Sequence, residues 1–283
     1  MFQKKYSEIT SLVQNEINQI LQEMIKDIDV HVSLKSELLK FLNAPSKHIR
    51  PIISILYLKA LNIDIDEKQI LYQAAIELVH NASLIHDDVI DESELRRGKN
   101  TLNNKFNSKL AVITGDYLLS DALNKVIKIG RIELIQMFSD TLDEMSEGEI
   151  NQQFSKFTIP SLNDYIKKSE QKTAKLFETA LCGSLLIADF KYDGLDFAKN
   201  FGIAFQIRDD LINCKTTNSD IKDGIYTAPV IFAGGTKIND DAIEKTQTLL
   251  NNYIESAKNN LSNIEDNEYK QALCELLELF KNE

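Results

Sequence analysis

Apolar residues recur at three- and four-residue steps along most of the chain, which is the spacing of one face of an α-helix. The pattern predicts helices over residues 9–24, 70–91, 108–129, 132–153, 161–188, 195–212 and 242–261. No alternating run of apolar and polar residues is long enough to predict a β-strand of useful length. The chain is therefore expected to have an all-α fold.

One predicted helix, over residues 70–91, is apolar on more than one side and is expected inside a helical bundle. No solenoid repeat or low-complexity linker interrupts the chain, so we expect a single domain over residues 1–283. The least regular segments, 92–107 and 214–239, each follow an acidic motif. Loops in such positions often carry function.

Composition narrows the class of protein. The 283 residues include only 10 Gly and 4 Pro, and this scarcity of helix breakers favours long helices. The net charge of −11 excludes a basic footprint for nucleic acid. Cys182, Cys214 and Cys274 are widely spaced, which predicts reduced thiols and a cytoplasmic location. Neither a secretory signal nor an apolar run long enough for a transmembrane segment is expected.

The first acidic motif closes the apolar helix over residues 70–91. Asp87 and Asp91 are four residues apart and share one helix face, with Asp88 about 100° around. Neighbouring carboxylates repel each other unless a cation neutralises them, and hard oxygen ligands on a helix suit Mg²⁺. An EF-hand is excluded because its alternating ligands and central Gly are absent. A solvated helix end is the simpler interpretation of such a motif alone.

A second acidic motif favours the metal site over that simpler interpretation. Asp209 and Asp210, followed by Asn213, close another apolar helix. Basic residues flank the first motif: Lys47 and Arg50 precede it, and Arg96 and Arg97 follow it. Arginine binds phosphate oxygens bidentately, and lysine adds a point charge. Acidic and basic clusters in one acidic chain predict a site for a polyphosphate with bound metal.

These motifs occur in the order found in the trans-isoprenyl diphosphate synthase (polyprenyl synthase) family, which the chain resembles over nearly its whole length. Residues 46–51 (SKHIRP) are similar to the family's isopentenyl diphosphate site. The first aspartate-rich motif is matched by residues 80–91 (HNASLIHDDVID) with the basic sequel 95–98 (LRRG). Further signatures are matched by 115–119 (GDYLL), 148–152 (GEINQ), 172–177 (KTAKLF) and 202–210 (GIAFQIRDD).

The resemblance implies an isoprenoid-synthase-like helical bundle around a central substrate tunnel, and a Mg²⁺-dependent prenyltransferase. It would condense isopentenyl diphosphate with an allylic diphosphate, farnesyl or geranyl, using three metal ions. The metal ligands would be Asp87, Asp91 and Asp209. The catalytic residues would be these three aspartates together with Asp88, Asp210, Lys172, Thr173 and Gln206. The substrate contacts would be Lys47, Arg50, His80, Arg96, Arg97, Lys172, Thr173, Gln206 and Lys215. A hydrogen-bonded core histidine is an equal alternative for His80.

Product length and assembly follow by analogy. The small residues Ala82 and Ser83, with Val79 below them, would let the prenyl tail pass down the helix that carries Asp87. The resemblance then implies a long-chain product of about six to eight isoprene units. The family's layout also implies a homodimer, with the helix over residues 108–129 as the interface.

The chain departs from the family pattern where Asn213 and Ile225 replace an aspartate and a lysine. Three alternatives stay open. A short-chain farnesyl or geranylgeranyl synthase would share all the motifs. A class I terpene cyclase would lack the second diphosphate site that Lys47, Arg50 and His80 indicate. A non-catalytic subunit of a heteromeric synthase would tend to lose the aspartates.

Overall fold

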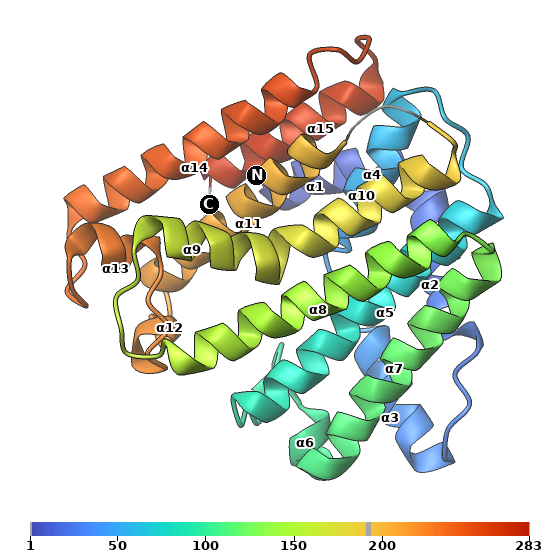
Figure 1. Cartoon of the computed structure of the whole chain (residues 1–283), viewed down its shortest axis with the longest axis horizontal. Coiled ribbons are helices and arrows are strands. Elements are labelled where there is room, and N and C mark those ends of the chain that lie inside the picture. The colour runs from blue at the N-terminus through green and yellow to red at the C-terminus, as the bar shows by residue number, and fades with distance from the viewer. Residues whose placement is uncertain (1, 191–193, 283) are drawn as a thin grey trace. The chain divides into compact units, whose positions relative to one another are not determined.

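The computed structural model describes residues 2–190 and 194–282, and it is helical over most of them (Figure 1). The prediction of an all-α fold is confirmed. Within the described ranges, the only strands are the two-residue β1 (Leu95–Arg96) and β2 (Lys99–Asn100), which pair antiparallel. The helices are α1 (Phe2–Ser11), α2 (Gln14–Lys26), α3 (Val32–Leu42), α4 (Ile49–Ala60), α5 (Glu67–Ile90), α6 (Leu102–Lys105), α7 (Ser108–Ile129), α8 (Ile132–Phe154), α9 (Leu162–Ser169), the π-helix η1 (Glu170–Ala174), α10 (Lys175–Ile187), α11 (Leu195–Lys215), α12 (Ser219–Lys222), α13 (Ala228–Ala233), α14 (Asp240–Asn260), α15 (Glu268–Glu278) and the 3₁₀-helix η2 (Leu279–Asn282).

The chain divides into two compact units. The first, called the α5 unit below, comprises Val13–Ile55 and Asp64–Gln136. The second, called the α11 unit, comprises Met1–Leu12, Leu56–Ile63 and Met137–Glu283. Each acidic motif therefore belongs to a different unit, and the expected single domain stays a prediction.

The α5 unit is built on the packing of α5 against α7 and α2, with α5 and α7 side by side (Figure 1). The carboxylate of Asp66 starts α5 by accepting hydrogen bonds from the backbone N–H groups of Lys68 and Gln69, both at 2.9 Å. Near the other end, Gly115 of α7 lets the helices approach. A Cβ at Gly115 would lie 2.2 Å from Nε2 of His86, so a larger residue here would displace the His86 ring.

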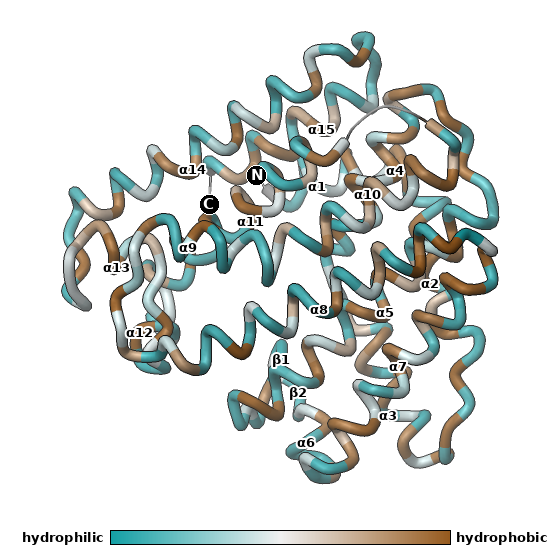
Figure 2. The backbone as a smooth tube through the Cα atoms, viewed as in Figure 1, coloured by the Kyte–Doolittle hydropathy of each residue, from teal (hydrophilic) through white to brown (hydrophobic). Residues whose placement is uncertain are grey.

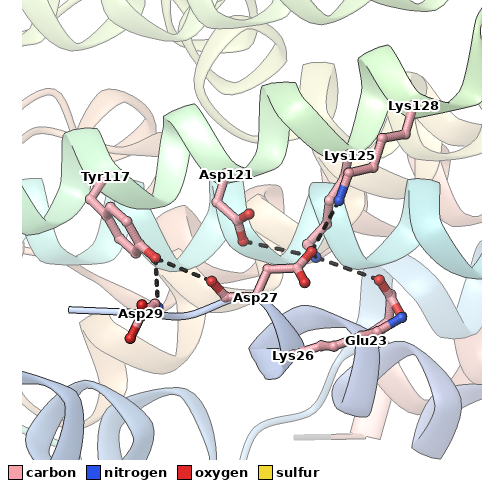
Figure 3. Close-up of polar contacts among 8 residues, drawn as sticks. All are labelled: Glu23, Lys26, Asp27, Asp29, Tyr117, Asp121, Lys125 and Lys128. Atoms are coloured by element: carbon pink, nitrogen blue, oxygen red, sulfur yellow. Dashed lines mark hydrogen bonds and ion pairs between the residues drawn. The ribbon is translucent and has the colours of Figure 1, made fainter.

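An ionic cluster joins the end of α2 to α7 in the same unit (Figure 3). Lys125 is fully buried, and its Nζ lies 3.2 Å from Asp27, 3.6 Å from Glu23 and 3.9 Å from Asp121. Hydrogen bonds from Lys128 and Lys125 lower the pKa of Asp27, so that carboxylate stays charged. A buried lysine is tolerated here because three carboxylates surround it.

The α11 unit centres on α11, which packs against α10, η1 and α14. Gly202 permits close contact with η1, because a Cβ at this position would lie 2.5 Å from Cα of Ala174. Aromatic rings fill the core beside it: Phe201 lies 5.4 Å from Phe177 and 5.1 Å from Phe280 between ring centroids. Alternating polar and apolar residues along α14 are visible in Figure 2, as expected for a helix with one buried face.

Two predicted helices are interrupted. The stretch over residues 9–24 forms α1 and α2, because the backbone breaks at Val13, which has φ −129° and ψ 14°. The stretch over residues 161–188 forms α9, η1 and α10. The irregular segment 92–107 holds the β1–β2 hairpin and α6, and 214–239 holds α12 and α13.

Among the described residues, no helix combines the length and the apolar character needed to cross a membrane. Cys182, Cys214 and Cys274 are free thiols.

Candidate active site

The carboxyl end of α5 carries the first acidic motif, and Asp91 caps the helix: its backbone N–H donates to the carbonyl oxygens of Asp87 and Val89. Asp87 is half-buried and Asp91 is exposed, while Asp88 is buried. Because the helix separates Asp88 from the other two, the motif has an outward pair and one inward carboxylate. The outward pair presents its oxygens from successive turns, as the spacing predicted.

The inward carboxylate holds the basic hairpin. Nε of Arg96 donates a 2.8 Å hydrogen bond to Oδ1 of Asp88. Burial raises the pKa of Asp88, and the charge of Arg96 opposes this rise. The Arg96 guanidinium and the Asp88 carboxylate therefore form an ion pair, which fixes β1 to the end of α5.

The turn of this hairpin places an arginine in a strained conformation. Arg97 and Gly98 connect β1 to β2 with φ values of 51° and 72°. Positive φ is costly for a residue other than glycine and is seen often at functional sites. Nη1 of Arg97 donates a 3.1 Å hydrogen bond to the carbonyl oxygen of Pro45. The hairpin therefore holds Arg97 against the segment that leads into Lys47 and Arg50.

His80 lies among the basic residues of the α5 unit. Its pKa is well below the ordinary value, first because of burial and then because of the charges of Arg50, Arg97 and Arg96. His80 is therefore neutral at physiological pH, and its imidazole can donate and accept hydrogen bonds. All four residues were predicted as substrate contacts, and the charges of the three arginines act on His80. Lys47 lies three residues before Arg50 and is exposed.

His48, between Lys47 and Arg50, is held in place by a buried acid. Its Nδ1 lies 2.7 Å from Oε2 of Glu77 on α5, and Glu77 is 1% exposed. His48 has φ 44°, a second strained position beside the site. Glu77 was not predicted from the sequence, because a lone acid within an apolar helix gives no motif.

The second acidic motif lies at the carboxyl half of α11 and is also divided. Asp209 has a 45% exposed side chain and lies 2.9 Å from Nη1 of Arg208. Asp210 is buried and receives two hydrogen bonds, from the Tyr165 hydroxyl at 2.6 Å and from Nε2 of Gln206 at 2.8 Å. Burial raises the pKa of Asp210 to about 7, although both hydrogen bonds oppose the rise.

The π-helix η1 adds the predicted Lys172 and Thr173 to this network. Thr173 donates a 2.6 Å hydrogen bond to Oε1 of Gln206, which continues the chain to Asp210. Lys172 forms an ion pair with Glu149 of α8. π-helical turns occur often at functional sites, and this one sets the direction of two predicted site residues. Glu149 lies within the matched signature 148–152 but was not predicted as a site residue, and Tyr165 has no motif around it in the sequence.

Lys215 and Asn213 end the second motif. Lys215 is exposed at the last position of α11. Nδ2 of Asn213 donates a 2.8 Å hydrogen bond to Oγ of Ser219, and its Oδ1 accepts from the backbone N–H of Asp220 at 3.4 Å. Asn213 therefore fixes the start of the short helix α12.

The donor chemistry of both motifs fits a divalent metal. No group of three or more His, Cys, Asp or Glu side chains in the described part of the chain is arranged to hold a metal ion by itself. Mg²⁺ commonly takes one or two protein carboxylates and completes its shell with water and substrate phosphates. The outward carboxylates Asp87, Asp91 and Asp209 match that requirement.

The comparison with protein families decides the class. The family model for polyprenyl synthetase matches residues 31–269. The chain belongs to the polyprenyl synthetase family. The prediction that it is an enzyme of the prenyltransferase class is confirmed by this membership, and members of the family use divalent metal.

Relatives and solved structures agree with this family. A prenyl transferase of Cyanidium caldarium is 31% identical, with 96% of this chain and 97% of that protein covered. A decaprenyl-diphosphate synthase of Dictyostelium discoideum is 33% identical over 81% of this chain and 56% of its own length. A Caulobacter crescentus polyprenyl synthase, solved with calcium and isoprenyl diphosphate, has a TM-score of 0.89 at 22% identity, covering 98% of each chain. The expected isoprenoid-synthase-like fold is thereby confirmed.

Proposed function

We propose that this polyprenyl synthetase condenses isopentenyl diphosphate with an allylic diphosphate, farnesyl or geranyl, to give a longer all-trans polyprenyl diphosphate. The observation that carries the proposal is the carboxyl-terminal part of α5, which carries the outward carboxylates and, two turns before Asp87, a neutral histidine among arginines. An acidic pair suits a metal-bound diphosphate, and a basic cluster suits a second diphosphate. A condensation needs sites for two diphosphates, whereas a class I terpene cyclase lacks the second of these sites.

The metal of the proposal is Mg²⁺, in three ions, held by Asp87, Asp91 and Asp209. When bound, it would neutralise diphosphate charge and so improve the leaving group. Lys172 and Lys215 would bind the remaining phosphate oxygens. Asp88 and Asp210 act by holding Arg96, Gln206 and Tyr165 in place, as their hydrogen bonds support.

The chain's own residues would perform three tasks. Arg50, His80 and Arg97, with Lys47, bind the diphosphate of isopentenyl diphosphate and orient its double bond. Arg96 and Lys172 bind the allylic diphosphate, whose carbon–oxygen bond breaks. The double bond attacks the allylic carbon, and a proton passes to the departing diphosphate. Thr173 and Gln206 place oxygen dipoles beside the transient positive charge.

The proposed product is long. Ser83 lies one turn before Asp87 on the same face of α5, and the neighbouring Ala82 is small and fully buried. With Val79, two turns back, these residues would line the path of the tail. Relatives named decaprenyl and solanesyl diphosphate synthases support this choice over a short-chain synthase.

A homodimer through α7 completes the proposal. Val112, Ile113, Leu123 and Ile127 are between 38% and 63% exposed. At 100° per residue they fall within one arc of about 100° on α7. The faces toward α5 and α2 are used by Gly115 and by Lys125 respectively. An exposed apolar stripe on an otherwise packed helix is suited to a second copy. The cytoplasmic location stays a prediction.

The test is incubation of the pure protein with Mg²⁺, isopentenyl diphosphate and farnesyl diphosphate, followed by chromatography of the extracted lipids. We expect a ladder of longer prenyl alcohols after phosphatase treatment, and none after chelation with EDTA. Absence of elongation with Mg²⁺ would contradict the proposed function and favour the non-catalytic subunit. A ladder that stops at the first or second addition would favour the short-chain alternative.

A further inference from the structure

A cavity of about 780 Å³ in the α5 unit lies between α3, α6 and the β1–β2 hairpin. Its charged lining consists of five cations and a single carboxylate: Lys40, Arg96, Arg97, Lys99, Lys105 and Glu37. The whole chain, by contrast, has a net charge of −11. A concave surface with one sign of charge focuses the electrostatic field and concentrates ligands of opposite charge.

The single carboxylate of the lining, Glu37, already pairs with two lysines. Oε1 of Glu37 lies 2.8 Å from Nζ of Lys40, and Oε2 pairs with Lys105. Hydrogen bonds from Lys105 and Lys40 lower the pKa of Glu37, so it remains charged and bound to both. One carboxylate between two lysines leaves the cavity with an excess of positive charge.

The other three cations of the lining, Arg96, Arg97 and Lys99, differ in their hydrogen-bond partners. Arg96 uses Nε on Asp88, and Arg97 uses Nη1 on the carbonyl oxygen of Pro45. Lys99 follows directly in β2, and over residues 2–190 and 194–282 its ammonium makes neither a hydrogen bond nor an ion pair. Hairpin pairing of Arg96 with Lys99 fixes the position of Lys99 beside Arg97. An unneutralised cation in a cavity of like charges is unfavourable unless an anion joins it.

We propose that this cavity is an additional anion site, in which Lys99, Lys40 and Lys105 bind a diphosphate group beside Arg97. The volume falls within the range of about 300–1,000 Å³ typical of small-molecule sites. The apolar side chains of Phe41 and Leu102 line the same cavity and suit the short hydrocarbon of isopentenyl diphosphate. The ligand class rests on the proposed function, and its source is either incoming isopentenyl diphosphate or the pyrophosphate that the reaction releases.

Binding can be measured without turnover, by titration calorimetry with inorganic pyrophosphate in EDTA at low ionic strength. Lys99→Ala removes a cation from the cavity and is expected to weaken binding about threefold to fivefold, the range for an exposed charge. Glu37→Gln removes the one carboxylate, releases Lys40 and Lys105, and is expected to strengthen binding. Both differences should shrink at 0.5 M salt, where the charges are screened.

Lys68→Ala is the matched control. Lys68 is exposed, belongs to the same unit and lies near the start of α5, about 28 Å along the helix from Asp87. It carries the same charge change, so an effect of net charge alone would be equal in Lys68→Ala and Lys99→Ala. Equal affinities in these two variants, or no gain in Glu37→Gln, would overturn the site. Melting temperatures should stay within about 2 °C of the wild type, because the changed side chains lie at the surface or the cavity rim.

Steady-state kinetics distinguishes the two sources of diphosphate. A raised KM for isopentenyl diphosphate in Lys99→Ala, at unchanged kcat and unchanged KM for the allylic substrate, assigns the site to the incoming substrate. A raised inhibition constant for pyrophosphate alone assigns it to the released product. Unchanged values of both would contradict the site even where the enzyme elongates normally. A wild-type protein that binds pyrophosphate but makes no product would contradict the proposed function and leave the site standing.

Discussion

The two acidic motifs look alike in sequence, and each divides in the same way in the structure. The first aspartate of each pair is outward, since Asp87 is half-buried and Asp209 is 45% exposed in its side chain. The second is inward, since Asp88 is 2% and Asp210 is 3% exposed. What differs is the partner of the inward carboxylate. Asp88 pairs with the charged Arg96, whereas Asp210 accepts from the neutral Tyr165 and Gln206.

The difference shows two ways to bury a carboxylate. In the α5 unit, a positive charge compensates the negative one, and the pair fixes a hairpin of two arginines. In the α11 unit, burial raises the pKa of Asp210 to about 7, and this carboxyl group accepts a hydrogen bond from the neutral Gln206, which in turn accepts one from Thr173. We infer that the first motif positions cations for phosphate and that the second positions oxygen dipoles.

The largest effect is expected from the outward carboxylates. Asp87→Asn removes a charge from the pair at the end of α5, and turnover with farnesyl diphosphate should fall at least ~10²-fold. Folding should be retained, because neighbouring carboxylates repel each other without metal. Asp209→Asn should cost less, since the neighbouring Arg208 already balances its charge. Elongation assays and circular dichroism on both variants measure this, and normal turnover in Asp87→Asn would refute the metal assignment.

The inward carboxylates should differ in stability. Asp88→Asn breaks an ion pair and leaves the partly buried Arg96 without its acid, which should cost about 2 kcal/mol in the free energy of unfolding. Asp210→Asn should cost only about 1 kcal/mol, because the network can reverse its direction. The new amide would donate to Gln206, and Gln206 would donate to the Thr173 hydroxyl.

Urea unfolding of both variants, followed by circular dichroism at one pH, tests this ranking. A cost for Asp210→Asn equal to that of Asp88→Asn would show that the second network is not interchangeable. Thr173→Ala is a useful control, because it removes the end of the network and leaves the bonds to Asp210 in place.

Much of the fold could be predicted from the sequence, because amphipathic periodicity persists through long helices. The helix over residues 108–129 is found with the same bounds as α7, and 195–212 lies within α11. The break at Val13 could not be predicted, since apolar residues keep their spacing across it. The π-helix at Lys172 was also missed, because a single wider turn changes the register without changing the composition.

Within the candidate site, motifs identified the residues but not their directions. The neighbours Asp87 and Asp88 look equivalent in sequence, yet only the fold shows that the second meets Arg96. Tyr165 reaches Asp210 across 45 residues, and such a long-range pair has no local signal. The convergence of the two motifs on one ligand stays a prediction.

The two motifs also differ in the residue one helical turn before their first aspartate, and this difference concerns the path of the prenyl tail. Behind Asp87 on α5 is Ser83, whereas behind Asp209 on α11 is Phe205, whose ring lies 5.6 Å from Phe177 and 5.9 Å from Phe280. An aromatic cluster leaves no room for a chain, so the tail is expected along α5. Ser83→Phe should therefore shorten the products to about the farnesyl or geranylgeranyl size while the first addition keeps its rate.

Ala82→Phe is the comparison for this variant. Ala82 lies one turn before His86, which contacts Gly115, so a ring there also presses on α7. We expect shorter products together with a loss of about 1–3 kcal/mol in stability. Chromatography of the products alongside thermal melting separates the two effects. An unchanged product ladder from well-folded Ser83→Phe would mean that the tail takes another route.

The smallest effect is expected at Asn213, where the second motif has an amide in place of a carboxylate. Asn213→Asp would restore a third acid, but the described contacts show this side chain facing Ser219 and the backbone of Asp220. The Ser219 hydroxyl can reverse and donate to the new carboxylate, so the contact is retained, while the nearby Asp220 adds repulsion. We expect stability to change by less than about 1 kcal/mol and half-saturation by Mg²⁺ to shift less than about threefold. A Mg²⁺ titration of activity measures this, with Asn218→Asp as a control for charge on the same loop. A tenfold gain in Mg²⁺ affinity would show that position 213 faces the metal, and that the two motifs are more alike than their inward carboxylates indicate.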